Sequence, residues 1–495
     1  MSPQEGVVPE APAPQRAAPD SPTSWRVVAA TAVVWLAGTA IVAAGQPTPQ
    51  RREAAVGAAA AGIWLILVCN WTTPDRGRRY VRSLLGSIVA ASLTADAMLR
   101  LLSPTGVITV NFGSNGIEER IDLPLIVVLL LPLVGRELWT RRGELHLPRR
   151  PRPLDAIFAA YATIVAVPAL LLGLAHHDHL SYIGQDLGLL VFTVFAYLAG
   201  RLAGPLAARA CARDFVDVLL ALAVVQLALL NWEPAPFYAY AEAACAAAIG
   251  WWILRPGRGG ILPLAVAATV LVVDAVAVRN GSNSSTAIEL AGALGVVGYL
   301  VVRLRPLVPR WLVVAGIVAA LAGFIGFTSD GATVRGQYHG PDPSNTGRTF
   351  EAQQVRKEIR SSPLSLVLGR GFGATIDERH APLAFRNSLA NGGRDLAHVQ
   401  EVHLLPYSFL LKEGFLGLAW FFAFVIGLGW AALQGLERAV RERDPSFVIY
   451  AAVPVLALAQ AIAASSRLQA NPLTGLALGL LVTSLAAPLR RPRSS

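Results

Sequence analysis

The stretch from Phe415 to Leu433 reads FLGLAWFFAFVIGLGWAAL and contains no charged side chain. A helix of this length crosses the hydrocarbon core of a bilayer, which needs about 20 apolar residues. Comparable stretches recur along the 495-residue chain, and only 15% of its residues are charged, whereas soluble proteins carry roughly 25%. The sequence therefore predicts an all-α polytopic membrane protein with about 14 transmembrane helices, and excludes an ordinary soluble enzyme. The apolar stretches lie near residues 25–45, 54–71, 83–102, 123–139, 156–174, 186–204, 215–232, 239–254, 261–278, 287–302, 311–328, 415–433, 447–465 and 473–488.

The placement of the arginines predicts the orientation of these helices. Lys357 and Lys412 are the only lysines among 42 basic residues. When the N-terminus is placed in the cytoplasm, most short loops on that side are rich in arginine, as cytoplasmic loops usually are. We therefore expect a multi-pass plasma-membrane protein with both termini in the cytoplasm. The short loops on the opposite side contain only Arg51, Arg52, Arg120, Arg279 and Arg467.

One polar segment, residues 329–405, is too long to be a simple connection between helices. It lies on the outer side between the eleventh and twelfth apolar stretches, and we expect it to form an extracytoplasmic domain packed on the membrane bundle. The predicted organisation is a disordered cytoplasmic tail (1–24), transmembrane helices 1–11 (25–328), the extracytoplasmic loop (329–405), a re-entry helix with transmembrane helices 12–14 (406–488), and a second cytoplasmic tail (489–495).

The outer segment begins with a candidate amphipathic helix. Residues 347–360 read GRTFEAQQVRKEIR. Phe350, Val355 and Ile359 recur at helical intervals, Glu351 and Gln353 fill the other face, and the pattern stops before a proline. A solvated basic helix with no further role would have the same pattern.

Two further elements follow the predicted helix. The run Gly369-Arg370-Gly371-Phe372-Gly373 has glycines that allow a ligand to approach the backbone or φ to be positive, although an ordinary flexible turn would also contain them. His403 stands where the outer segment re-enters the membrane. Histidine has an unperturbed pKa of about 6.5, which suits proton transfer near neutral pH, although a histidine at a helix start is often structural.

Together these elements resemble the O-antigen ligase and polymerase family, whose members are polytopic membrane glycosyltransferases with one large extracytoplasmic loop before their final helices. Pro363 follows Arg348 by fifteen positions, and His403 precedes Gly414 by eleven and Gly417 by fourteen. The resemblance covers residues 270–435 in detail and the whole chain in topology. The sequence differs from the family in having Leu404 where asparagine usually follows the histidine, and Glu413 as the acid nearest to the one that usually precedes the glycine. Arg279-Asn280-Gly281 matches a Ser-Arg-Gly context of the family.

The resemblance implies a cell-surface polysaccharide polymerase or ligase, which moves a glycan from a polyprenyl-diphosphate carrier to a hydroxyl of an acceptor glycan or lipid. His403 would accept the proton of that hydroxyl, and Arg348 would offset the charge on the departing diphosphate. We expect an inverting reaction without metal or cofactor, and no nucleic-acid partner. Further contacts to the diphosphate are expected from Arg279, Arg356, Arg360, Gly369, Gly371, Gly373 and Arg100.

Charged residues within the apolar stretches leave alternatives open. Arg100 fits either a contact with the lipid diphosphate or a pair with Asp96, four positions before it. Asp274 and Glu289 flank Arg279 and are expected to support it. Glu413 is expected to support the site in the same way. Alternatively, Arg279 is an interfacial arginine whose side chain reaches the lipid headgroups.

The alternative function is a transporter or flippase of lipid-linked sugars. Transporters tend to contain internal repeats with a site near the middle of the membrane. No repeat is visible in this sequence, and its polar features gather in one outer segment, which favours the enzyme.

Overall fold

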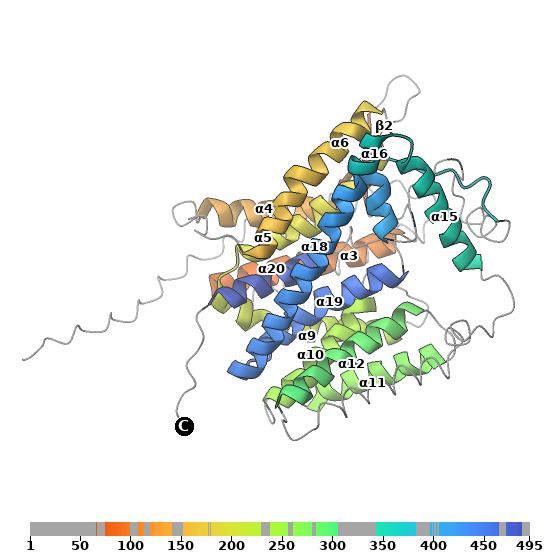
Figure 1. Cartoon of the computed structure of the whole chain (residues 1–495). Coiled ribbons are helices and arrows are strands. Elements are labelled where there is room, and N and C mark those ends of the chain that lie inside the picture. Colours follow the sequence, from red (N-terminus) through yellow and green to blue (C-terminus); the bar gives the residue numbers. More distant parts are fainter. Residues whose placement is uncertain are drawn as a thin grey trace, which may run out of the picture.

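In a computed structural model of the chain, the described residues are 66, 75–99, 107–112, 119–140, 152–176, 178, 180–228, 238–255, 261–279, 284–304, 343–382, 397, 399, 402, 405–464 and 472–487. This part of the chain is almost entirely helical (Figure 1). Its helices are α3 (Arg76–Leu99), α4 (Leu125–Thr140), α5 (Pro153–Ala160), η1 (Tyr161–Val165), α6 (Ala166–Ala175), α7 (Leu180–Asp186), η2 (Leu189–Val194), α8 (Phe195–Arg201), α9 (Pro205–Ala228), α10 (Tyr238–Leu254), α11 (Ile261–Arg279), α12 (Ser284–Leu304), α15 (Pro343–Ile359), α16 (Pro363–Leu368), α18 (Leu405–Glu442), α19 (Ser446–Ala464) and α20 (Pro472–Ala486).

A short hairpin departs from the predicted all-α chain. Strands β1 (Val107–Phe112) and β2 (Glu119–Pro124) pair antiparallel between α3 and α4, with Val107 opposite Pro124 and Phe112 opposite Glu119. β1 reads VITVNF, and such β-branched residues favour strands because their χ1 angles are restricted in helices. The described part of the chain is therefore predominantly helical, with this hairpin as the exception to the prediction.

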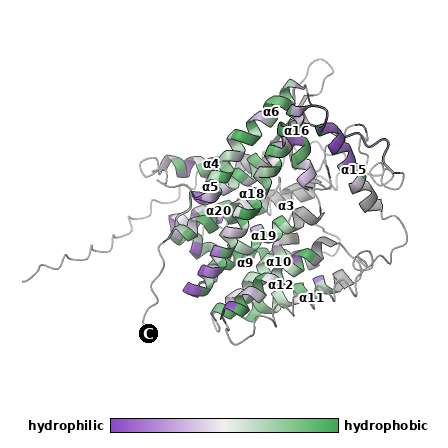
Figure 2. Cartoon of the chain, in the orientation of Figure 1, coloured by the Kyte–Doolittle hydropathy of each residue, from purple (hydrophilic) through white to green (hydrophobic). Residues whose placement is uncertain are grey.

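The predicted apolar stretches coincide with helices wherever the structure describes them. Those near 25–45, 54–71 (Ile66 apart) and 311–328 lie outside the described residues. Two helical segments of the described part, Pro153–Ala175 and Leu405–Glu442, are long and apolar enough to cross a membrane by length and composition. Figure 2 shows the predominantly apolar α6 and α18 beside the strongly hydrophilic α15.

Small residues allow close packing at the centre of the bundle. Gly475 and Gly479 lie one turn apart on α20, which packs against η2 and α8. A Cβ on Gly475 would lie 2.2 Å from the carbonyl oxygen of Thr193, and one on Gly479 would lie 2.3 Å from that of Tyr197. This small-xxx-small spacing lets helix backbones approach one another, as in membrane helix pairs.

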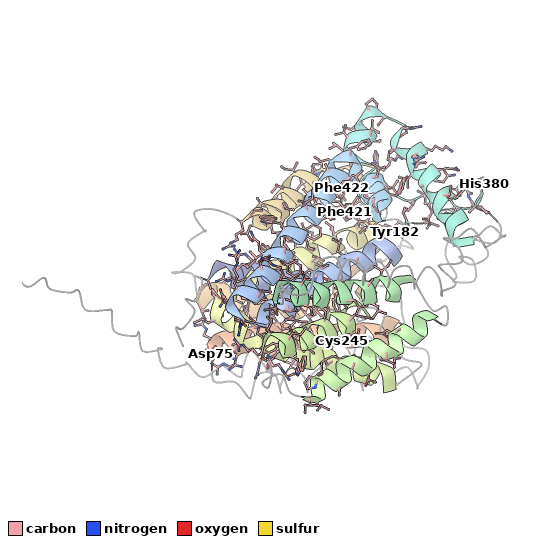
Figure 3. All side chains as sticks on the ribbon, turned by 60° about the horizontal axis from the view of Figure 1, so that its bottom comes forward. Asp75, Tyr182, Cys245, His380, Phe421 and Phe422 are labelled. Atoms are coloured by element: carbon pink, nitrogen blue, oxygen red, sulfur yellow. The ribbon has the colours of Figure 1, made fainter. Side chains whose placement is uncertain are left out.

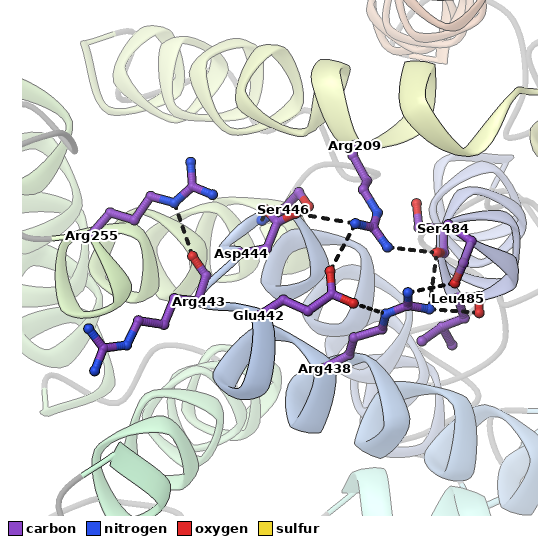
Figure 4. Close-up of polar contacts among 10 residues, drawn as sticks. Arg209, Arg255, Arg438, Glu442, Arg443, Asp444, Ser446, Ser484 and Leu485 are labelled. Atoms are coloured by element: carbon purple, nitrogen blue, oxygen red, sulfur yellow. Dashed lines mark hydrogen bonds and ion pairs between the residues drawn. The ribbon is translucent and has the colours of Figure 1, made fainter. Parts of the chain in front are cut away.

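Two buried arginines join the helices at one end of the bundle (Figure 4). Arg438 of α18 donates through Nε to Glu442 Oε1 at 2.6 Å, and Arg209 of α9 donates through Nη1 to Glu442 Oε2 at 2.9 Å. Arg438 also donates to the carbonyl oxygen of Leu485 at 2.8 Å and to that of Ala487 at 2.6 Å. It thereby satisfies carbonyl groups at the end of α20 that have no partner within their own helix. We call this set of contacts the arginine clasp.

Candidate functional site

The candidate site lies around a kink near the start of α18. Gly414 has φ 65° within this helix, so residues 405–413 meet the longer remainder at an angle. Only glycine fits there, because a Cβ would lie 2.4 Å from both the backbone nitrogen of Gly369 and the carbonyl oxygen of Val367. The two parts of α18 coincide in sequence with the predicted re-entry helix and the apolar stretch after it.

The glycine run 369–373 packs against this kink. Its backbone N–H groups donate to the carbonyl oxygens of Leu411 at 2.8 Å, Lys412 at 3.0 Å and, on α6, Ala169 at 2.9 Å. The run therefore ties the start of α18 to the end of α6.

The expected contact of Gly369, Gly371 and Gly373 with a diphosphate stays a prediction, and the structure shows another use of these glycines. Their φ angles are positive, at 75°, 100° and 91°, as predicted for glycine. Their N–H groups, however, all donate to acceptors within the chain. A Cβ on Gly371 would lie 2.3 Å from the backbone nitrogen of Gly173. The glycines thus serve close backbone packing, which a sequence pattern alone does not distinguish from ligand binding.

A buried ion pair lies beneath the glycine run. Lys412 Nζ donates to Asp186 Oδ1, and both side chains are almost completely buried. The other carboxylate oxygen, Asp186 Oδ2, accepts a bond of 2.7 Å from the backbone nitrogen of Gly373. Asp186 therefore joins the end of α7 to both the run and α18. This pair was not predicted from the sequence. A lysine in an apolar segment of a chain with only two lysines would have indicated a buried acidic partner.

Glu413, the expected supporting acid, is also buried. Its Oε1 accepts a bond of 2.8 Å from the Tyr161 hydroxyl of η1. A Cβ on Gly417 would lie 2.5 Å from Oε2, so the carboxylate lies over the next turn of α18. The Glu413 carboxylate is therefore held by a hydroxyl of the bundle, while its backbone lies against Gly369 of the outer segment.

The outer segment has a hydrophobic core of its own. This outer core consists of buried residues from α15, from the stretch after the glycine run, and from the start of α18, with Tyr407 and Leu418 packed against it. A bridge between Ile376 and Val399 closes it, with N–O distances of 2.9 and 3.0 Å. The members are Val355, Ile359, Ala374, Ile376, Val399, Val402, Leu410 and Leu411.

The helix predicted over 348–360 is α15, which begins earlier and ends at Ile359. Its buried face differs from the predicted one: Glu351, expected on the polar face, is fully buried together with Val355 and Ile359. These three positions are four apart, so they lie on one side of the helix. Pro363 opens α16, with Ser362 as its N-cap.

Arg356 connects α15 to the start of α18. Its Nη2 donates to the Tyr407 hydroxyl at 2.9 Å, and its guanidinium carbon lies 5.8 Å from the centre of that ring. Arg360 is exposed. Arg370 lies 3.7 Å from the carboxylate of Glu358, measured from Nε to Oε2. The exposed Arg356 and Arg360 and the half-buried Arg370 therefore belong to segments that pack against the start of α18.

Other charged groups of the outer segment are paired. Arg379 donates to both carboxylate oxygens of Asp377, and these bonds lower the pKa of that carboxyl from its usual value. Asp377 is therefore ionised near neutral pH and neutralised by its neighbour, which makes it a poor proton acceptor.

Several predicted site residues lie outside what the structure describes. This holds for His403, Arg100 and the side chains of Arg348 and Arg279. The nearest described residues to His403 in the sequence, Val402 and Leu405, are both buried. Their roles stay predictions.

Asp274 and Glu289 belong to a cluster of acids. They interact electrostatically with each other and with Glu242, across α10, α11 and α12. No basic residue is among the interacting partners described for the three. The described contacts therefore link them to one another, and their expected support of Arg279 is untested.

No protein-family model, curated protein or solved structure matches this chain. In the described part of the chain, no group of three or more histidine, cysteine, aspartate or glutamate side chains is arranged to hold a metal ion.

Proposed function

We propose that this protein is a multi-pass membrane glycosyltransferase with about 14 spans, similar to O-antigen ligases and polymerases. It transfers a glycan from a polyprenyl-diphosphate carrier to an acceptor hydroxyl at the outer membrane face. His403 and Arg348 are its catalytic residues, and both termini are cytoplasmic.

The observation that supports this proposal most is the attachment of α15 to the start of α18. Arg356 contacts Tyr407, four positions after His403, and the outer core joins the same two helices. α15 also contains Arg348, eight positions before Arg356. Eight residues of helix span about 12 Å, a distance that a carrier diphosphate with its bound sugar can bridge. The element that contains the proposed diphosphate-binding arginine thus packs against the helix that begins two positions after the proposed base.

The proposed reaction forms one bond and breaks another at the anomeric carbon. The acceptor oxygen attacks this carbon while the bond to the diphosphate oxygen breaks, so the configuration is inverted. The acceptor proton passes to the imidazole of His403. Arg348, with Arg356 and Arg360 nearby, offsets the charge on the leaving diphosphate, because guanidinium groups remain charged and bind phosphate oxygens in pairs.

The decisive experiment measures glycan transfer from a polyprenyl-diphosphate donor in proteoliposomes. His403→Ala and Arg348→Ala are each expected to abolish transfer without reducing membrane insertion. Two exposed residues of the same segment provide matched controls. His380→Ala and Arg379→Ala are expected to retain activity. Full turnover by both test variants would overturn the assignment, and repeating the assay with a chelator tests the expected independence from metal.

A transporter or flippase of lipid-linked sugars is the second candidate, favoured by the acid cluster. Glu289 is fully buried and interacts with Glu242 and Asp274 within a set of apolar helices. Ionisable residues inside membrane bundles often mark ion pathways. Movement of a labelled lipid-linked sugar across vesicles that is lost in Glu289→Gln, without any transfer to an acceptor, would favour this candidate over the enzyme.

A further inference from the structure

The six-residue helix α16 buries a polar side chain and exposes its apolar ones, the opposite of the usual arrangement in a water-soluble protein. Ser365 is its buried position, with an exposed fraction of 6%, whereas Leu364 and Val367 are 56% and 52% exposed. Leu366 is exposed as well. In water this arrangement leaves apolar surface hydrated, which is unfavourable because apolar side chains are more stable when removed from water. An apolar environment would remove this cost.

The location of α16 indicates which environment that is. Its last turn packs on the kink of α18, where Val367 approaches Gly414. Immediately after the kink, α18 carries a stripe of exposed apolar side chains on one face. Figure 3 labels one member, Phe422, beside its neighbour Phe421, which is buried. The stripe consists of Phe415, Phe422, Ile426, Trp430 and Leu433.

The length of this stripe matches a bilayer. From Phe415 to Leu433 the helix rises about 27 Å, close to the roughly 30 Å of a hydrocarbon core. Below Leu433 follow Arg438 and Arg441, and on the other side of α16 stands the hydrophilic end of α15 with Arg356 (Figure 2). α16 therefore lies at the outer end of the apolar stripe and directly beside cationic groups.

We infer that α16 is an interfacial anchor whose exposed leucine and valine side chains contact the acyl chains of the outer leaflet. The inference rests on the proposed crossing of the membrane by α18. The anchor fixes the depth of the glycine run and of Arg356, Arg360 and Arg370, so that these guanidinium groups lie at the level of lipid phosphates. A lipid-linked diphosphate would then reach the start of α18 from within the leaflet.

The test uses the full chain in nanodiscs of phosphatidylethanolamine and phosphatidylglycerol. Cys69, Cys211 and Cys245 are replaced by alanine. A nitroxide label is then attached to the new thiol of Leu364→Cys or Val367→Cys. The experiment measures how often the nitroxide collides with oxygen, which concentrates in lipid, and with a nickel chelate, which stays in water. Phe422→Cys provides the lipid reference, and Lys357→Cys, an exposed position on α15, provides the water reference.

Labels at 364 and 367 are expected to show several-fold lower nickel accessibility than the label at 357, with oxygen accessibility approaching that at 422. Nickel accessibility equal to that at 357 would overturn the anchor while leaving the crossing by α18 intact. Low accessibility to both reagents would also overturn it, since protein would then cover the helix. Nickel access at 422 would contradict the proposed crossing itself.

Discussion

At the scale of single residues, the buried pair of Lys412 and Asp186 is the contact on which the kinked start of α18 depends most. Two charges removed from water are costly, and their attraction compensates only while both are present. Lys412→Met should therefore lower the free energy of unfolding by about 3–5 kcal/mol, since the buried Asp186 carboxylate loses the charge that neutralises it. Thermal unfolding in detergent measures this change.

The double variant distinguishes charge from packing. Asp186→Asn added to Lys412→Met removes the uncompensated charge, so this protein should be more stable than Lys412→Met alone. Arg379→Met, which breaks an exposed pair with Asp377, should leave the unfolding temperature close to that of the wild type, because water screens exposed charges. Wild-type stability in Lys412→Met would show that the pair contributes nothing.

The proposed base makes a second prediction at this scale. A protonated imidazole cannot accept the acceptor proton, so the protein is inactive below the pKa of His403 and active above it. With an ordinary histidine pKa of about 6.5, kcat/KM should rise as pH increases through that value. A rate profile between about pH 5 and pH 8 measures this rise. A flat profile would exclude His403 as the base.

At the scale of elements, the glycine run and the end of α6 fit one another only without side chains. Gly371→Ala imposes φ 100° on alanine and places its Cβ 2.3 Å from Gly173. The backbone strain alone costs about 1–3 kcal/mol, and the clash adds to it. Gly184→Ala on α7, where nothing lies within 4 Å of the new Cβ, should change stability by less than about 1 kcal/mol. Equal unfolding temperatures of the two variants would contradict this account.

The elements also mark how far the sequence could be interpreted. Apolar stretches predicted helices well, because an apolar segment of this length has few other ways to satisfy its backbone. The hairpin was missed because the prediction followed hydropathy alone, whereas Val107, Ile108 and Val110 reflect strand preference. Glu351 was assigned to the wrong face because a glutamate is rarely buried without a partner supplied by the fold. The positive φ angles of the glycine run were predicted correctly, whereas its close packing against α6 and α18 was not predicted, because ligand binding and close packing require the same residue type.

At the scale of the whole molecule, α18 connects two polar centres through an apolar middle. One centre is the buried pair at its start, and the other is the arginine clasp at its end. Glu413 and Arg438 are separated by about 37 Å of helix. Nothing local in the sequence predicts that Arg209 and Arg438, from distant helices, share one carboxylate. The arginine clasp is such a long-range contact, because it joins α9, α18 and the end of α20.

The clasp predicts a separation of stability from activity. Glu442→Gln leaves two buried guanidinium groups without the charge that they share, and the longer pair of Arg209 with Asp444, at 3.8 Å, replaces it poorly. The free energy of unfolding should fall by about 3–5 kcal/mol, whereas the initial transfer rate per folded molecule should stay at the wild-type value, because the proposed site lies at the other end of α18. Glu437→Gln, which breaks the more exposed contact with Arg303, is the matched control and should destabilise the protein much less than Glu442→Gln, because water screens exposed charges. A loss of transfer in Glu442→Gln that exceeds its loss of folded protein would contradict this separation and would mean that the two ends of α18 are coupled.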